Sequence, residues 1–300
     1  MNLKEFSDKL LDSLYSKHYK KLVLIPLLFI LADLAIIGST YMQTGDFLQK
    51  DVSLSGGTIA TIYSDTDFGS LKPALDKEFP TSEIQVTYLT EFGTEKRVGA
   101  IVEATNIKSD AIKSAIEKEY DLKLTQDNFS IEEVGSSLGE SFYRQMLVAM
   151  AFAFLFMSVT VLIIFRRVVP SVAVIVTAFV DILTTVAILD IIGMKISTAG
   201  IAALLMLIGY SVDTDMLLTT KVLKKTEGTV SSRIKGSIMT GLTMTATTMA
   251  AMLVAIAVSQ SQVLVQMFTI ILIGLTIDVF ATYCFNAGML AWYMKRKQAQ

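Results

Sequence analysis

Six aspartates lie inside long apolar runs of this sequence, where a carboxylate is costly. They are Asp33, Asp181, Asp190, Asp213, Asp215 and Asp278. At the centre of a bilayer each would cost about 2.5 to 3.5 kcal/mol on insertion scales. Acidic side chains in such places carry protons or ions, or form hydrogen bonds between helices. The sequence therefore points to ion chemistry inside a membrane.

Asp181 is the strongest candidate for a proton or ion site. It lies about eleven residues into its apolar run, or about 16 Å at 1.5 Å per residue, near the membrane midplane. Asp278 also lies well inside its run. For both residues the alternative is a structural hydrogen bond between helices. We interpret Asp33 as a group of that structural kind, and we expect Asp190 to lie close enough to the outer surface for water to reach it.

A second set of ionisable residues occupies G-Y-S-V-D-T-D-M-L-L-T-T-K at 209–221. Asp213 and Asp215 are two residues apart, so on a helix they point to nearly opposite faces. We expect one to face the helix bundle and the other a partner or water. Lys221 lies on the face of Asp213, about two turns later. It snorkels to the interface, pairs with a carboxylate of a neighbouring span, or only marks the membrane side.

Other chemistries find little support in the sequence. His18 is the only histidine and Cys284 the only cysteine, which leaves no intrachain disulfide and too few ligands for a metal site. Basic residues sit in short clusters between apolar runs, where membrane topology explains them better than nucleic-acid binding does. We expect no catalytic residue, no metal, no cofactor and no nucleic acid.

Six apolar runs must position these carboxyl groups. Hydrophobic residues make up 52% of the 300 residues and charged residues 18%, so most of the chain requires lipid. The runs are predicted at about residues 22–41, 145–165, 168–192, 196–220, 238–258 and 263–292. Lysine and arginine cluster before the first run, after the second and fourth, and at the chain end. The positive-inside rule then places both termini in the cytoplasm.

The predicted organisation has one domain outside a cytoplasmic membrane. Its parts are an amphipathic cytoplasmic segment at 1–21, a first span at 22–41, an extracytoplasmic domain at 42–141, five further spans within 142–292 and a cytoplasmic tail at 293–300. The outer block is acidic, with 9 Lys and Arg against 18 Asp and Glu over residues 43–141.

Periodicity within the outer block predicts the element order βαββαβ. The strands are expected at 58–63, 84–89, 98–104 and 129–133, and the helices at 68–79 and 108–119. Each helix has one apolar stripe, so four strands can bury one face under two helices, as in ferredoxin-like domains. The predicted fold class is a polytopic α-helical membrane protein with six transmembrane helices and an inserted α+β ferredoxin-like domain.

Several motifs occur in the order found in the SecD and SecF family. D-V-S-L-S-G-G-T at 51–58 resembles the signature that opens the outer domain of this family, and V-G-S-S-L-G at 134–139 is similar to the one that closes it. The D-T-D of the fourth span looks like the archaeal form. The matching residues are Asp51, Gly56, Gly57, Gly135, Gly139, Asp181, Gly209, Tyr210 and Ser211. The resemblance covers essentially the whole chain.

This resemblance implies a SecF-type subunit that pairs with SecD in a transporter of the resistance-nodulation-division type. It further implies a place beside the SecY channel and contact with a translocating polypeptide, with ion flow implicated in bacterial members. Bacterial members have Asn-Asp-Thr at 213–215 and an arginine at Lys221. A buried lysine can lose its proton and an arginine cannot, so the bacterial relay does not transfer whole. Small residues of the fifth run, such as Gly241 and Ala246, are expected to pack against SecD.

Two rival functions follow from the same features. A stand-alone small-molecule exporter of this type would need a second six-span half, and no internal repeat is visible. An intramembrane aspartyl protease would use two acids that share a proton. Such proteases carry G-x-G-D, whereas residues 209–213 lack the second glycine beside the acid.

Overall fold

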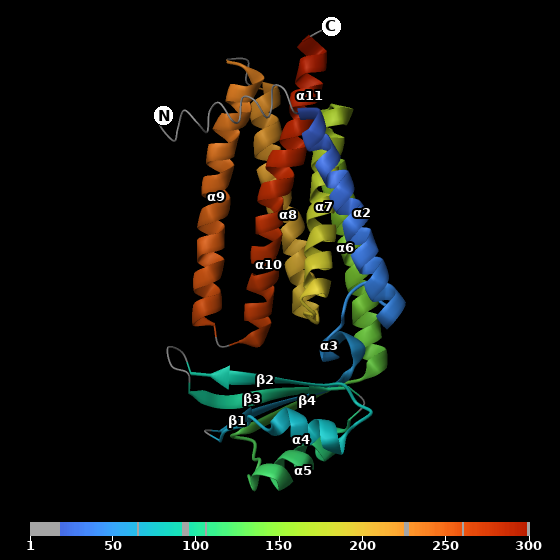
Figure 1. Ribbon diagram of the computed structural model, residues 1–300, viewed down its shortest axis with the longest axis vertical. Coiled ribbons are helices and arrows are strands. Elements are labelled where there is room, and N and C mark those ends of the chain that lie inside the picture. Colours follow the sequence, from blue (N-terminus) through green and yellow to red (C-terminus); the bar gives the residue numbers. More distant parts are fainter. Residues whose placement is uncertain are drawn as a thin grey trace.

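The protein has two parts, a bundle of long helices and a small domain of strands and short helices at one end of it (Figure 1). The computed structural model describes residues 19–64, 66–91, 96–105, 107–224, 228–259 and 261–298. Residues 1–18 of the predicted amphipathic segment at 1–21 lie outside the described residues. Tyr19 already begins the first long helix.

Within the described residues, six helical stretches are long and apolar enough to cross a membrane, as predicted. They are α2 (Tyr19–Thr44), α6 (Ser136–Phe165), α7 (Val168–Ile191), α8 (Thr198–Lys224), α9 (Val230–Val258) and α10 (Gln262–Ala281), which continues through a π-helical turn, η1 (Thr282–Asn286), into α11 (Ala287–Gln298). The second and fifth helices begin earlier than the predicted 145 and 238. Hydropathy marks the point at which a helix enters lipid. Both helices begin before that point, outside the apolar stretch.

Helices α7 and α8 form the centre of the bundle. More than half of each apolar stretch is buried, compared with 6% for α6 and 11% for α9. Large apolar side chains of α6, such as Phe152, Leu155 and Phe156, are exposed. Lipid solvates such side chains well, and helices satisfy their own backbone groups. The protein is therefore a multi-pass helical membrane protein.

The small domain is a four-stranded antiparallel sheet with two helices on one face (Figure 1). Its elements are β1 (Gly57–Tyr63), α4 (Leu71–Glu78), β2 (Ile84–Thr90), β3 (Arg97–Ala104), α5 (Ser109–Tyr120) and β4 (Phe129–Val134). The sheet order is β2-β3-β1-β4. The predicted strands and helices occur in the predicted order, with ends that differ by a few residues.

Alternation along β1 gives the sheet two different faces. Ala60 and Ile62 are fully buried in a core that includes Phe68. Ile59 and Thr61, between them in sequence, lie partly exposed on the opposite face. Helices α4 and α5 cover the first face, and the second face points toward the helix bundle (Figure 1).

This two-faced sheet generates a stability prediction. A soluble fragment of about residues 50–135 should unfold cooperatively, because it carries its own core. Ile62→Ala should lower its free energy of unfolding by about 2 to 5 kcal/mol, since it leaves a cavity in that core. Thr61→Ala, one residue away on the other face, should cost less than about 1 kcal/mol.

Urea unfolding followed by circular dichroism measures both values. A fragment without a cooperative transition, or equal losses for the two variants, would contradict this account of the domain.

Candidate functional site: three buried carboxyls and a domain junction

Three of the predicted carboxyl groups meet inside the bundle. Asp181 on α7, Asp215 on α8 and Asp278 on α10 are each fully buried. Asp181 lies close enough to the other two to interact with both electrostatically. The three helices that carry them pack against one another pairwise. Sequence reasoning named all three residues but did not predict that they form one cluster.

Asp181 and Asp278 lie within hydrogen-bonding reach of each other. A hydrogen bond between two carboxyl groups requires a proton on one of them. The hydroxyl of Ser211, a residue of the fourth-span motif, donates to Oδ2 of Asp181. Oδ1 of Asp181 and Oδ2 of Asp278 are buried without a hydrogen-bond partner among the described residues.

Asp215 is held by two side chains of the π-helical turn. The Thr282 hydroxyl lies 2.9 Å from Oδ1 of Asp215 and 3.2 Å from Oδ1 of Asp278. The Asn286 amide nitrogen donates to the same Oδ1 of Asp215 at 2.7 Å. These donors are neutral, so they do not cancel negative charge. Three ionised carboxylates here would repel one another in a medium of low dielectric constant. Simultaneous ionisation of all three carboxyl groups is therefore unfavourable.

Sequence reasoning missed Thr282 and Asn286. A signal was present: Asp278, Thr282 and Asn286 follow one another at intervals of four residues, which places them on one helix face. The π-helical geometry of residues 282–286 was not foreseeable from hydropathy. Such turns occur frequently at functional sites.

Asp213 and Asp215 point to opposite faces of α8, as predicted. Asp215 is fully buried, whereas Asp213 is exposed. Met206 and Gly209 are exposed at the preceding helical intervals, so the three residues form one exposed stripe along α8. A Cβ atom at Gly209 would meet nothing within 4 Å. The neighbouring Tyr210 packs against the bundle core.

Lys221 extends from the end of α8 to α9. Its Nζ lies 2.7 Å from the hydroxyl of Thr240 and 3.3 Å from the carbonyl oxygen of Gly236. These contacts join the end of α8 to the first part of α9. The sequence predicts that both lie on the cytoplasmic side of the membrane. A pairing of Lys221 with a carboxylate stays a prediction.

Two expectations for polar residues near the surface of the bundle have different outcomes. Thr184 donates a hydrogen bond of 2.6 Å to Oδ2 of Asp33, so the interhelical role of Asp33 is confirmed. The expectation that Asp190 is solvated is wrong, because only 7% of this residue is exposed. Its depth depends on how residues 44–50 fold over the helix end, and sequence position alone does not give that.

The expectation that Gly241 faces another chain is also wrong. Gly241 is buried, and a Cβ atom there would overlap the hydroxyl of Tyr283 in η1. The glycine lets α9 approach the π-helical turn closely. Ala246, by contrast, is exposed on α9.

The opening motif at 51–58 forms the junction between the sheet and the bundle. Asp51 caps the short helix α3 (Val52–Ser55), accepting hydrogen bonds from the backbone and hydroxyl of Ser53 at 2.9 and 2.6 Å. The backbone nitrogen of Asp51 donates to the Ile196 carbonyl at 3.1 Å. Thr198, the first residue of α8, donates its backbone N–H to the Ser53 hydroxyl at 3.1 Å.

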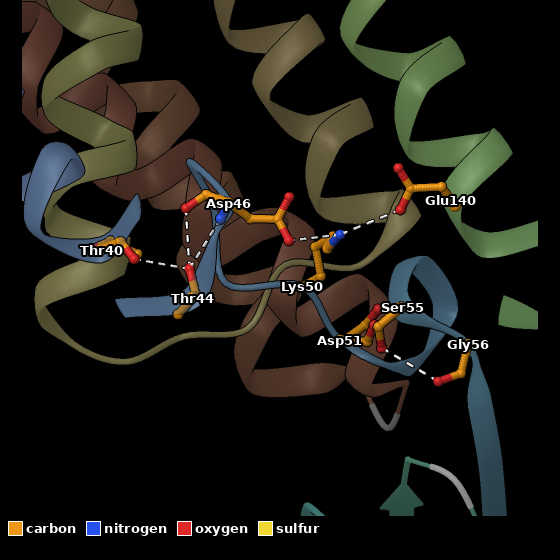
Figure 2. A network of polar contacts seen from close by, with 8 residues as sticks. All are labelled: Thr40, Thr44, Asp46, Lys50, Asp51, Ser55, Gly56 and Glu140. Carbon is orange, nitrogen blue, oxygen red and sulfur yellow. Dashed lines mark hydrogen bonds and ion pairs between the residues drawn. The ribbon is translucent and has the colours of Figure 1, made fainter. Parts of the chain in front are cut away.

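Lys50 ties the same junction to α6 (Figure 2). Its Nζ lies 2.7 Å from Asp46 and 3.7 Å from Glu140. The ammonium group also lies over the Tyr143 ring, 4.7 Å from its centroid. Only 14% of the Lys50 side chain is exposed. The Lys50 ammonium group is thus paired in a partly buried site. These contacts hold the segment that follows α2 against α6.

The motif glycines allow close contacts at this junction. Gly56 and Gly57 have φ angles of +83° and +144°, which favour glycine. At Gly139, on α6, a Cβ atom would lie 2.7 Å from the Leu54 carbonyl oxygen of α3. Gly135 has nothing within 4 Å, so packing does not explain it.

Two carboxyl groups near the junction have perturbed acidity. Burial raises the pKa of Asp51, opposed by the hydrogen bonds of Ser53 and by the charge of Lys195. Burial also raises the pKa of Glu103 on β3, and the charge of Asp51 raises it further. Lys195 opposes this shift too and forms an ion pair with Glu83 at 2.9 Å. The ammonium group of Lys195 therefore interacts electrostatically with three carboxylates, those of Asp51, Glu103 and Glu83.

The junction region touches the ends of α7 and α8, and it reaches α10 through the loop between those two helices. The Gln49 amide donates to the carbonyl of Asp190, near the end of α7, at 3.3 Å. Ser53 contacts the start of α8, as described above. Gln266 of α10 donates to the carbonyl of Lys195 at 2.6 Å and accepts from the Ser197 hydroxyl. The sheet domain is thus bonded to α7, α8 and the loop between them, and that loop is bonded to α10.

Comparison with known proteins identifies the family. The family model described as "Protein export membrane protein SecD/SecF, C-terminal" matches residues 113–296. "Protein-export membrane protein SecF" of Methanothermobacter thermautotrophicus is 36% identical, over 93% of this chain and 94% of its own. The chain belongs to the SecF family. The SecF protein of Methanocaldococcus jannaschii is 31% identical, over 95% of this chain and 99% of its own.

Solved structures share the fold of this SecF-family chain. SecDF of Thermus thermophilus, described as a translocon-associated membrane protein, is 19% identical with a TM-score of 0.66. SecDF in a super-membrane-facing form is 18% identical with a TM-score of 0.57. Each match covers 92% of this chain but 38% of the SecDF chain. The chain thus spans well under half the length of these SecDF proteins.

The contrast between two motif glycines generates a prediction. Gly139→Ala should destabilise the purified protein by about 1 to 3 kcal/mol, because the added methyl group pushes α3 away from α6. Gly135→Ala, in open space at the N-cap of α6, is the matched control and should cost less, under about 1 kcal/mol, because alanine is only a weaker N-cap than glycine. Size-exclusion chromatography after heating in detergent measures the temperature at which half of the folded protein is lost. Equal temperatures for the two variants would refute the close contact.

Proposed function

We propose that this chain is the SecF subunit of a SecDF complex that assists Sec-dependent protein export. Membership of the SecF family, over nearly the whole chain, carries the proposal. The coverage of SecDF supports a division of labour. This chain supplies one six-span half, and a SecD chain supplies the remainder.

In the proposed orientation both termini are cytoplasmic and the sheet domain is ferredoxin-like and extracytoplasmic. The start of α2 and the end of α11 lie at the end of the bundle away from the sheet (Figure 1), which supports this. The basic pair Arg166 and Arg167, between α6 and α7, lies at that same end. Order β2-β3-β1-β4 with two helices on one face supports the ferredoxin-like description.

The exposed stripe of α8 is the proposed contact with SecD. A carboxylate facing lipid at this depth is costly, so Asp213 requires a partner surface or water. Gly209, one turn earlier, permits close approach of a second helix. Ala246 on α9 is a second exposed small residue that could pack against SecD. Gly241 is not available for such packing, because it contacts Tyr283 of the same chain.

The buried carboxyls are the proposed coupling site for ions. Loading or losing a proton at Asp181, Asp215 or Asp278 changes the charge of the cluster, and the hydrogen bonds among α7, α8 and η1 must then rearrange. Seventeen residues of α8 separate Asp215 from Thr198, about 26 Å at 1.5 Å per residue. A rigid helix of that length carries a displacement to the junction. The outer domain would respond beside the SecY channel, where a polypeptide emerges.

An intramembrane protease receives no support from this arrangement. Asp181 and Asp278 are adjacent, as in an aspartyl dyad, but both are fully buried between helices. A peptide bond and the water that attacks it must reach such a dyad together. The arrangement favours proton storage over hydrolysis.

Pairing with SecD gives the first test of this function. Purification of the tagged chain from native membranes should recover a SecD chain in a stable complex, because the exposed polar stripe of α8 requires a cover. Mass spectrometry of the bound proteins identifies the partner. Recovery of homodimers alone would refute the proposal.

Asp181→Asn tests the ion site. The amide keeps the shape and much of the hydrogen bonding of the protonated acid but cannot ionise, so the site stays neutral. Insertion and SecD association should remain normal, while stimulated export should fall to the level without the chain. Asp213→Asn should be milder, because it lies outside the buried cluster. Complementation in an export-limited strain, at matched protein levels, measures this. Export equal to the parent would make Asp181 a packing residue.

A further inference from the structure

A large cavity lies between the sheet and the helix bundle. Its volume is about 1020 Å³, at the upper end of the range of about 300 to 1,000 Å³ typical of ligand sites. The helix-free face of the sheet forms one wall, with Ile59, Thr61 and Tyr63. The ends of α8, α9 and α10 form the other, with Thr198 and Ile256 among the lining residues. We refer to this space as the sheet-bundle cleft.

The charge of the sheet-bundle cleft has one sign. Among its described lining residues four are acidic and none is basic, the acids being Asp51, Glu91, Glu103 and Glu132. Lys195, next to the cleft, is already shared by Asp51, Glu103 and Glu83. Glu132 lies exposed on β4. The field inside the cleft therefore attracts cations and repels anionic lipid headgroups.

The dimensions of the cleft suit an extended chain. Along β1, Ile59 to Tyr63 spans about 13 Å at roughly 3.3 Å per residue, and four strands about 4.8 Å apart span about 14 Å. About four extended residues cover such a floor. Apolar and tyrosine side chains alternate with hydroxyl groups across it, so the floor accepts side chains of mixed character. Tyr63, which is exposed at the end of β1, offers a ring face for cationic groups.

We propose that the sheet-bundle cleft binds an extended, unfolded polypeptide segment that bears lysine or arginine. This choice of occupant rests on the proposed export function, because an exported chain emerges unfolded on the side of the outer domain. Glu103 and Glu132 hold the basic side chains, and the sheet face holds the rest. The cleft lies directly on the junction at Asp51 and Thr198, so an occupant contacts the elements that lead to the buried carboxyls.

Peptide binding to the full-length protein tests this site. The protein is placed in nanodiscs of phosphatidylcholine, and a fluorescent peptide of Ser, Gly and Tyr with interspersed lysines is compared with its glutamate counterpart by anisotropy. The lysine peptide should bind more tightly, and salt should weaken it. Glu103→Gln combined with Glu132→Gln should weaken binding about three- to tenfold. Asp76→Asn with Glu119→Gln, the same charge change on exposed positions of α4 and α5, should not.

A cross-link identifies the occupant in cells. Thr61→Cys, in a chain whose only cysteine is removed by Cys284→Ala, carries a photoactivatable group inside the cleft. Adducts with an exported reporter support the proposal. Adducts confined to SecD overturn it and make the cleft a subunit interface. Equal binding of the lysine and glutamate peptides also overturns it.

Failure of the cleft is distinguishable from failure of the proposed function. SecD co-purification and export complementation are measured on the parent protein in the same strain. If both succeed while the peptides bind alike, only the cleft assignment falls. If both fail, the SecF role falls, whatever the peptides do.

Discussion

A carboxyl group surrounded by apolar atoms is stable only when a proton or a hydrogen-bond donor compensates its charge. Three such groups share one site between α7, α8 and α10, and much of the bundle serves that need. The two most buried helices carry two of the acids. The third helix changes to π-helical geometry at Thr282, the first of its two donors to the site. Ser211, Thr282 and Asn286 supply dipoles but no charge.

Helix α8 links the parts of the molecule because its faces and ends have different neighbours. One face carries Asp215 and Ser211 into the cluster, and the opposite face carries Asp213 outward. Its first residue is bonded to Ser53 of the junction. One helix with continuous backbone hydrogen bonds therefore joins the cluster to the junction.

Much of this architecture could be predicted from local patterns. Hydropathy located six spans, and alternation such as Ile84, Val86 and Tyr88 indicated a strand, because both signals depend only on residues close in sequence. The convergence of Asp181, Asp215 and Asp278 depends on how three helices pack, which no local pattern encodes. The same limit explains the errors at Asp190 and Gly241. Each is covered by a segment distant in sequence, residues 44–50 in one case and Tyr283 in the other.

The sheet domain enters and leaves the bundle at neighbouring points, because Gly57 at the start of β1 pairs directly with Val134 at the end of β4. Paired residues of antiparallel strands have Cα atoms about 4.5 to 5.5 Å apart. The distance between the two points where the domain joins the bundle is therefore fixed by this pairing. It does not depend on the size or fold of the rest of the domain. The entropy of closing a loop grows only slowly with its length. Domains of very different size could occupy this position during evolution without changing the distance between α2 and α6.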